Sequence, residues 1–287
     1  MTIEDDLVVD IGWLRAHSDD HNITILDATV QKDDARIPPY FSGRDHFEDH
    51  GHIPGARHVD LLTELSDPDA RFPFTRPRRD QVERLLTTLG VGANSTIVIY
   101  DTRGGAWAAR ALWVLRSWGL TRIALLDGSL ADWAASGGVI AYGSAHAHTA
   151  SVIGPVTLDD HDRGFVDLPD VEGLAAGTRG GRLISAAATE IYNGEREVAG
   201  RRGHIPRSVD VSYRDFVISG DRVDLSALRA RLDELGISPD EPIVTYCGGG
   251  VDASGLAVAL WRLGSTNVAV YDGSLSEWNS HPGRPLE

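Results

Sequence analysis

Three short motifs occur twice in this chain, and the two sets follow the same order. Each set contains a Gly-His-Ile-Pro turn, an apolar run ending in tyrosine, and an Asp-Gly-Ser segment that ends in tryptophan. The motifs lie at residues 51–54, 97–100 and 127–133, and again at 203–206, 243–246 and 272–278. This repeat predicts two domains with the same fold, for which 287 residues are long enough.

The stretch between the copies, residues 141–155, is rich in Gly, Ser, Ala and His and shows no apolar period. Such a composition is typical of a linker. We therefore predict an N-terminal domain at 1–142, a linker at 143–155 and a C-terminal domain at 156–287.

Strand and helix patterns alternate within each copy. In the first copy we expect strands at 23–26, 97–100 and 123–126, and helices at 79–89 and 106–118. Short apolar strands between helices predict an α/β fold, in which each domain has a parallel sheet with helices on both faces. Ligands bind such sheets beyond the carboxyl ends of the strands.

Cys247 is the single cysteine of the chain, and it stands at such a strand end, before three glycines and a predicted helix. The glycines let backbone N–H groups point inward, and the helix adds its positive dipole end, so both features favour a thiolate. A lone cysteine is more often a small buried apolar residue. The corresponding residue of the first copy is Asp101, which cannot act as a thiolate, so we expect that domain to be non-catalytic.

Composition excludes several classes of partner. The formal net charge of −15 argues against binding to nucleic acid or to anionic lipid. A single cysteine forms no intrachain disulfide, no apolar run reaches membrane-spanning length, and the acidic start lacks a signal pattern. We expect a cytoplasmic protein without membrane association, in which local donors must attract any anionic substrate.

Together, the repeat, the two turns, the Asp-Gly-Ser segments and the cysteine loop resemble a two-domain rhodanese-type sulfurtransferase over essentially the whole chain. The resemblance implies that Cys247 carries sulfur as a persulfide, taken from thiosulfate or 3-mercaptopyruvate and passed to cyanide or a thiol acceptor. It implies ping-pong kinetics and no metal or organic cofactor. The N–H groups of the following loop would cradle the persulfide: Gly248, Gly249, Gly250, Val251, Asp252 and Ala253.

The chain departs from that family at several positions. Gly249 stands where serine or lysine is usual, and Asp252 stands where threonine is usual. Asp252 either caps the following helix or raises the pKa of Cys247. Two upstream arginines that bind substrate in the family are missing from 185–194. Four later arginines are our candidates for that role: Arg196, Arg201, Arg202 and Arg207.

Other functions fit less well. Phosphatases of this fold use a loop one residue longer that closes with arginine, whereas residues 247–252 end in a carboxylate. The glycines at 248 and 250 mimic a dinucleotide motif, but the first copy lacks them. His46, His50 and His52 resemble a metal cluster, although His52 belongs to the repeated turn. Two hypotheses remain: an active sulfurtransferase, or a diverged member that binds a partner or relays sulfur from one without turnover of small donors.

Overall fold

The structure is a computed structural model that describes residues 7–144, 156–159 and 163–287. Most of the predicted linker, residues 143–155, lies outside the described residues. Contacts divide the chain into two compact units, and each includes a short segment from the other half of the sequence. Unit 1 consists of Met1–Asp69, Arg76–Asp162 and Ser219–Arg222. Unit 2 consists of Ala70–Thr75, Arg163–Ile218 and Val223–Glu287. The predicted domain boundaries remain a prediction.

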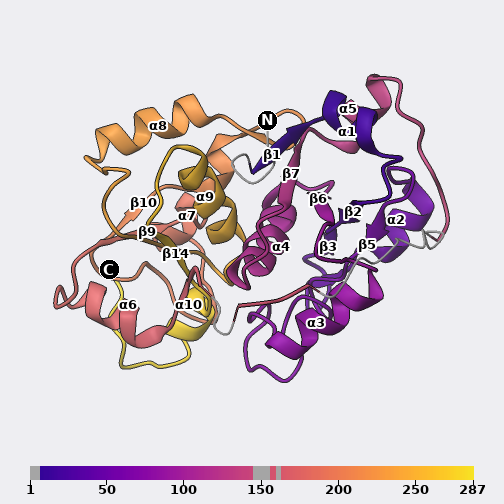
Figure 1. Ribbon diagram of the computed structural model, residues 1–287. Coiled ribbons are helices and arrows are strands. Elements are labelled where there is room, and N and C mark those ends of the chain that lie inside the picture. The colour runs from indigo at the N-terminus through magenta and orange to yellow at the C-terminus, as the bar shows by residue number, and fades with distance from the viewer. Residues whose placement is uncertain (1–6, 145–155, 160–162) are drawn as a thin grey trace. The chain divides into compact units, whose positions relative to one another are not determined.

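Unit 1 is built on a parallel five-stranded sheet with the order β1-β7-β6-β2-β5 (Figure 1). The strands are β1 (Val8–Asp10), β2 (Ile23–Asp27), β5 (Arg57–His58), β6 (Thr96–Tyr100) and β7 (Ile123–Asp127). The helices are α1 (Ile11–His17), α2 (Arg44–His50), α3 (Arg79–Thr88), α4 (Ala106–Ser117) and α5 (Leu130–Ala135). An antiparallel hairpin joins β3 (Val30–Lys32) to β4 (Tyr40–Ser42).

Unit 2 repeats this architecture, with the parallel order β10-β9-β13-β14-β8. Its strands are β8 (Phe165–Val166), β9 (Arg182–Ser185), β10 (Ser208–Asp210), β13 (Ile243–Tyr246) and β14 (Val268–Tyr271). Its helices are α6 (Leu168–Ala175), α7 (Thr189–Tyr192), α8 (Leu225–Glu234), α9 (Val251–Arg262) and α10 (Ser274–Trp278). The 3-10 helix η1 (Tyr213–Phe216) precedes β11 (Val217–Ile218) and β12 (Arg222–Val223), which pair in a small two-stranded sheet.

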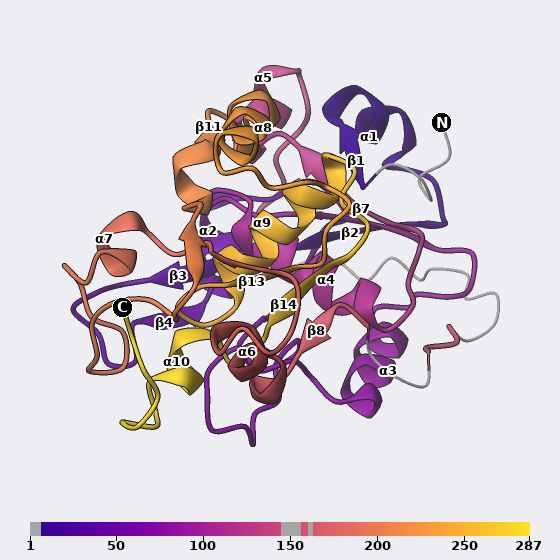
Figure 2. The ribbon, with the colours of Figure 1, turned by 90° about the vertical axis from the view of Figure 1, so that its left-hand side faces the viewer.

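The predicted α/β class and the order of elements are confirmed, and the predicted segments of the first copy correspond to β2, α3, β6, α4 and β7 within a residue at either end. Helix α4 packs on β6 and β7, and α9 packs on β13 and β14. Figure 2 shows α9 alongside β13 and β14. Within the described residues, no helix combines the length and apolar character needed to cross a membrane.

The repeated motifs perform the same packing task in each unit. Trp133 and Trp278 are buried, and each indole N–H donates to a backbone carbonyl, that of Val139 over 2.8 Å and that of Pro285 over 3.0 Å. The apolar runs end in Tyr100 and Tyr246, whose buried hydroxyls accept hydrogen bonds from the isoleucine N–H of the respective Gly-His-Ile-Pro turn. The repeat is therefore a set of core anchors.

The histidines of the two turns are also equivalent. His52 stacks on Phe47, and His204 stacks on Tyr192, each pair with ring centroids 3.7 Å apart. Each Nδ1 also lies within hydrogen-bonding distance of the carbonyl of its stacking partner. His52 therefore has a structural role, as its place in the repeated turn predicts.

Candidate active site

Cys247 lies where β13 ends and the backbone turns towards α9. The residue is buried, with 3% of its surface exposed. The backbone N–H of Gly250 donates a hydrogen bond to Sγ over 3.2 Å. Gly250 has a φ of 86°, in the left-handed region that favours glycine, and the helix begins at the next residue. The loop therefore folds around the sulfur atom.

The electrostatic surroundings of Cys247 act in opposite directions. Burial has the largest effect and raises the pKa of the thiol, and the carboxylate of Asp252 raises the pKa further. The backbone N–H groups of Ala253, Gly249 and Gly250 lower the pKa. The net pKa is raised. The N–H groups of the loop therefore favour the thiolate, as expected, but desolvation outweighs them and the pKa of the resting thiol is raised.

The first residues of α10 form hydrogen bonds with the backbone of the cysteine loop. The hydroxyl of the buried Ser274 accepts a hydrogen bond from the N–H of Cys247 and donates one to the carbonyl of Tyr271. The N–H of Leu275 donates to the Cys247 carbonyl, and Ser276 donates from both its N–H and its hydroxyl to the Gly248 carbonyl. The second Asp-Gly-Ser segment thus fixes the position of the loop.

Asp252 is not the cap of α9. The N-cap is Gly250, which makes no side-chain capping bond. The Asp252 carboxylate instead forms a two-point ion pair with Arg214, with Nη2 to Oδ1 at 2.9 Å and Nε to Oδ2 at 3.4 Å. Of the two roles considered for Asp252, the effect on the Cys247 pKa is confirmed in direction and the capping role is wrong.

Arg214 was missed by the sequence analysis. It belongs to η1, and the ring of the preceding Tyr213 lies against α9 at Gly255, where a Cβ would be only 2.7 Å from the ring. This close packing holds η1 beside the first turns of α9. The sequence did contain a weak signal for a basic residue at this site, because Arg214 is the only basic residue between Arg207 and Arg222.

Three of the four candidate arginines contact residues outside the cysteine loop, and the fourth is exposed. Arg201 donates to the carbonyls of His281 and Arg284, and Arg202 donates to the carbonyls of Gly194 and Glu195. The guanidinium of Arg207 lies next to Gly177, and Arg196 is exposed. Their role in substrate binding remains a prediction.

A second segment lies over the loop. Phe74, in the Ala70–Thr75 segment of unit 2, is buried and has a φ of 61°. A Cβ added to Gly249 would lie 3.8 Å from Cδ2 of Phe74 and 4.0 Å from the carbonyl oxygen of Pro73. The phenylalanine therefore lies close to the glycine loop.

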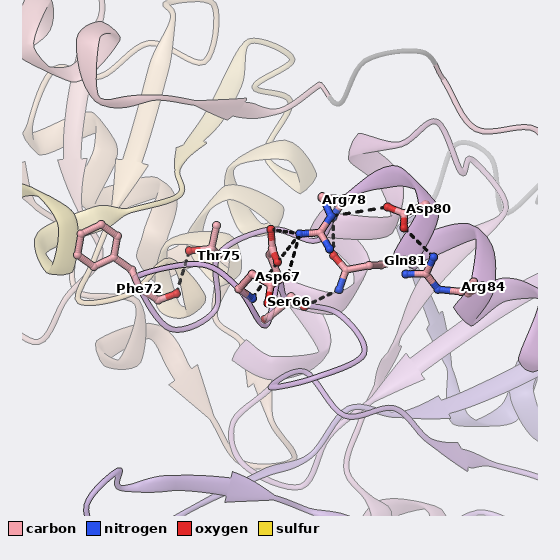
Figure 3. Close-up of polar contacts among 9 residues, drawn as sticks. Ser66, Asp67, Phe72, Thr75, Arg78, Asp80, Gln81 and Arg84 are labelled. Atoms are coloured by element: carbon pink, nitrogen blue, oxygen red, sulfur yellow. Dashed lines mark hydrogen bonds and ion pairs between the residues drawn. The ribbon is translucent and has the colours of Figure 1, made fainter.

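Figure 3 shows the polar contacts near this segment in the chain. Arg78 donates to both carboxylate oxygens of Asp67 at 2.8 Å, and its own N–H donates to the side chain of Gln81. The Thr75 hydroxyl donates to the carbonyl of Phe72 over 2.9 Å. These bonds fix the turn immediately around Phe74 and the start of α3.

The corresponding loop of unit 1 is filled by its own side chain. One oxygen of the Asp101 carboxylate accepts hydrogen bonds from the N–H groups of Arg103 and Gly105 at 2.7 and 3.0 Å, and the other accepts from Ala108 at 2.8 Å. Burial raises the pKa of Asp101 to about 6, although these three bonds oppose the shift. Gly104 lies between Arg103 and Gly105, and its N–H donates instead to the carboxylate of Asp221 over 2.8 Å.

The histidines considered as a metal cluster do not form one with nearby acids. His46 and His50 stack on each other with ring centroids 4.4 Å apart. Among the described residues, no group of three or more His, Cys, Asp or Glu side chains is arranged to hold a metal ion.

Two α/β units of the same strand order, one of which carries a glycine loop around a buried cysteine, match known proteins that define the class of this protein as a tandem-domain sulfurtransferase. Residues 10–136 and 186–281 match the rhodanese-like domain, and the chain belongs to the rhodanese family.

The relatives agree with this class. The 3-mercaptopyruvate sulfurtransferase of Escherichia coli K12 is 31% identical over 286 residues, with 97% of both chains covered. The thiosulfate sulfurtransferase of Azotobacter vinelandii is 35% identical over 240 residues, covering 83% of this chain and 86% of that protein. The crystal structure of SseA from Escherichia coli matches with a TM-score of 0.79 at 30% identity, covering 94% of this chain and 98% of SseA.

Proposed function

We propose that this sulfurtransferase carries sulfane sulfur on Cys247 and takes it from a small anionic donor, thiosulfate or 3-mercaptopyruvate. The observation that carries the proposal is the 3.2 Å hydrogen bond from Gly250 to Sγ, in a loop whose neighbouring N–H groups also lower the pKa of the thiol. Two relatives support this choice of donors, because one is named a 3-mercaptopyruvate sulfurtransferase and the other a thiosulfate sulfurtransferase.

The first half-reaction forms the persulfide. The Cys247 thiolate attacks the outer sulfur of thiosulfate, a new S–S bond forms, and sulfite leaves with the electron pair of the broken S–S bond. With 3-mercaptopyruvate the C–S bond breaks instead, and the leaving enolate takes up a proton to give pyruvate. The loop N–H groups stabilise the charge that the attack places on the terminal sulfur.

The second half-reaction restores the enzyme. A thiophilic acceptor such as cyanide attacks the terminal sulfur and forms thiocyanate, and the electron pair of the S–S bond returns to the Cys247 thiolate. The first product leaves before the acceptor reacts, so kinetics should be ping-pong. In this proposal residues 156–287 form the catalytic domain, residues 1–142 form a non-catalytic domain, and residues 143–155 link them.

The raised pKa of Cys247 favours a second candidate function. A site that keeps its nucleophile protonated reacts slowly with small donors. The second candidate is therefore a diverged member that binds a partner or relays sulfur from one, without turnover of small donors. Intact mass after separate incubation with thiosulfate and 3-mercaptopyruvate distinguishes the two. Gain of one sulfur atom that cyanide removes, and that Cys247→Ser lacks, supports the proposed enzyme, whereas no gain from either donor supports the relay.

A further inference from the structure

An anionic donor needs a cation near Cys247, and the usual positions do not provide one. The stretch that carries substrate-binding arginines in similar proteins contains Ala187 and Ile191 here. The protein as a whole carries a formal net charge of −15. Binding of an anion therefore depends on a local positive group, and Arg214 is a basic residue whose ion pair with Asp252 reaches the cysteine loop.

The geometry of Arg214 suits this role. Its ion pair with Asp252 uses Nε and Nη2, which leaves Nη1 without a hydrogen bond in the described part of the chain. The Arg214 side chain is 51% exposed, whereas that of Asp252 is 21% exposed. A planar guanidinium held along one edge presents its other edge in a fixed direction.

Arg214 and Cys247 also interact electrostatically. Partial burial lowers the pKa of Arg214, but Asp252 and, more weakly, Tyr213 and Cys247 raise it, and the net direction is upward. The geometric link between Arg214 and the loop is the ion pair with Asp252, five residues after Cys247. An anion bound at Nη1 would share this neighbourhood with Cys247.

We propose that Arg214 binds the anionic group of the sulfur donor, and that Asp252 orients Arg214 while weakening its attraction for that anion. This inference rests on the proposed function, since it assigns the donor subsite of the same loop. It replaces the missing upstream arginines with a residue from a different element. It also accounts for the acidic residue at 252, a position where threonine is usual, because the carboxylate holds the guanidinium in place.

Sulfate tests the subsite without any sulfur transfer. Its affinity is measured by isothermal titration calorimetry at constant ionic strength for wild type, Asp252→Asn and the double variant Arg214→Gln/Asp252→Asn. We expect Asp252→Asn to bind sulfate most tightly and the double variant to bind about tenfold more weakly than Asp252→Asn, because a charge-assisted hydrogen bond is lost. Equal affinity of these two variants, or absence of sulfate binding in both, overturns the inference.

A matched ion pair supplies the control. Arg84 and Asp80 form an exposed pair at 2.6 Å in unit 1 (Figure 3), so the double variant Arg84→Gln/Asp80→Asn changes the same charges elsewhere. It should bind sulfate like wild type. A loss of affinity there equal to the loss between Asp252→Asn and the Arg214 double variant shows a general charge effect and also overturns the inference.

Thiosulfate then links the subsite to the reaction. For persulfide formation followed by intact mass, the Arg214 double variant should show a KM about tenfold above that of Asp252→Asn, with kcat little changed. A fall in kcat with unchanged KM contradicts donor binding by Arg214. If wild type gains no sulfur at all, the proposed function fails, while the sulfate affinities still decide whether Arg214 is an anion subsite.

Discussion

The loops at Cys247 and Asp101 occupy equivalent places in two sheets of the same strand order, yet their N–H groups are used differently. In unit 1 the Asp101 carboxylate accepts three backbone hydrogen bonds from its own loop. In unit 2 the sulfur atom of Cys247 accepts a hydrogen bond from Gly250 at 3.2 Å, and the N–H groups of Ala253 and Gly249 also act on the thiol and lower its pKa. The N–H groups of the unit 1 loop bind a carboxylate that belongs to the loop itself, whereas under the proposed function those around Cys247 would also stabilise a sulfur atom added to the thiol.

The largest expected difference between the loops is in catalysis. Cys247→Ser should lower the rate of thiocyanate formation from either donor by about a thousandfold or more, because a hydroxyl cannot carry sulfane sulfur. Asp101→Asn should leave the rate within about twofold of wild type. The comparison fails if the serine variant retains transfer or if the asparagine variant loses it.

The second expected difference is in stability against pH. Asp101 has a folded pKa of about 6 against an ordinary 3.8, so between these values the folded state binds more protons than the unfolded state. The free energy of unfolding therefore falls as pH rises through this window, by about 3 kcal/mol for this group. Urea unfolding of Asp101→Asn at several pH values should lack this contribution.

The exposed Asp69 supplies the control, since its side chain is 81% exposed. Asp69→Asn should give a pH profile parallel to that of wild type. A parallel profile for Asp101→Asn as well would show that the unit 1 loop does not hold a buried acid with a raised pKa.

A smaller change concerns the reactivity of the thiol. Asp252→Asn removes a negative charge that raises the pKa of Cys247, so the pKa should fall and alkylation by iodoacetamide at pH 7 should accelerate up to about tenfold. The rate is measured across pH 6 to 10 to locate the midpoint. An unchanged midpoint would show that the ion pair with Arg214 already cancels the charge.

The smallest change adds a hydroxyl to the glycine loop. A Cβ at Gly249 would contact Phe74, Pro73 and Ser276 at 3.8 to 4.0 Å, which are ordinary van der Waals distances. Gly249→Ser should therefore change the free energy of unfolding by less than about 0.5 kcal/mol. It should raise turnover of 3-mercaptopyruvate a few fold, because a hydroxyl in the loop beside Cys247 could donate a proton to the leaving enolate.

Gly255→Ser is the steric control for that variant. A Cβ there would lie 2.7 Å from the Tyr213 ring, so we expect clear destabilisation in urea unfolding. Equal stability of the two variants would mean that the loop and the Tyr213 contact are equally adaptable. A Gly249→Ser variant with unchanged turnover would contradict the proton-transfer role.

The fold and the central cysteine were predictable because they depend on local patterns. Apolar strands, repeated turns and anchors such as Trp133 and Trp278 follow from short sequence periods and from the repeat itself. The ion pair of Arg214 with Asp252 was not predictable, because it joins residues 38 positions apart through a short 3-10 helix with no periodic signal. The raised pKa of Cys247 also depends on burial, which requires the fold.

The two short segments that belong by their contacts to the opposite unit limit how the chain can be divided. Ala70–Thr75 belongs by its contacts to unit 2 and brings Phe74 to Gly249, while Ser219–Arg222 belongs to unit 1 and brings Asp221 to Gly104. A truncation between the copies would remove one of these residues from each remaining unit. Neither half of the sequence can therefore be separated from the other without removing a side chain that lies beside the loop of the half that is kept.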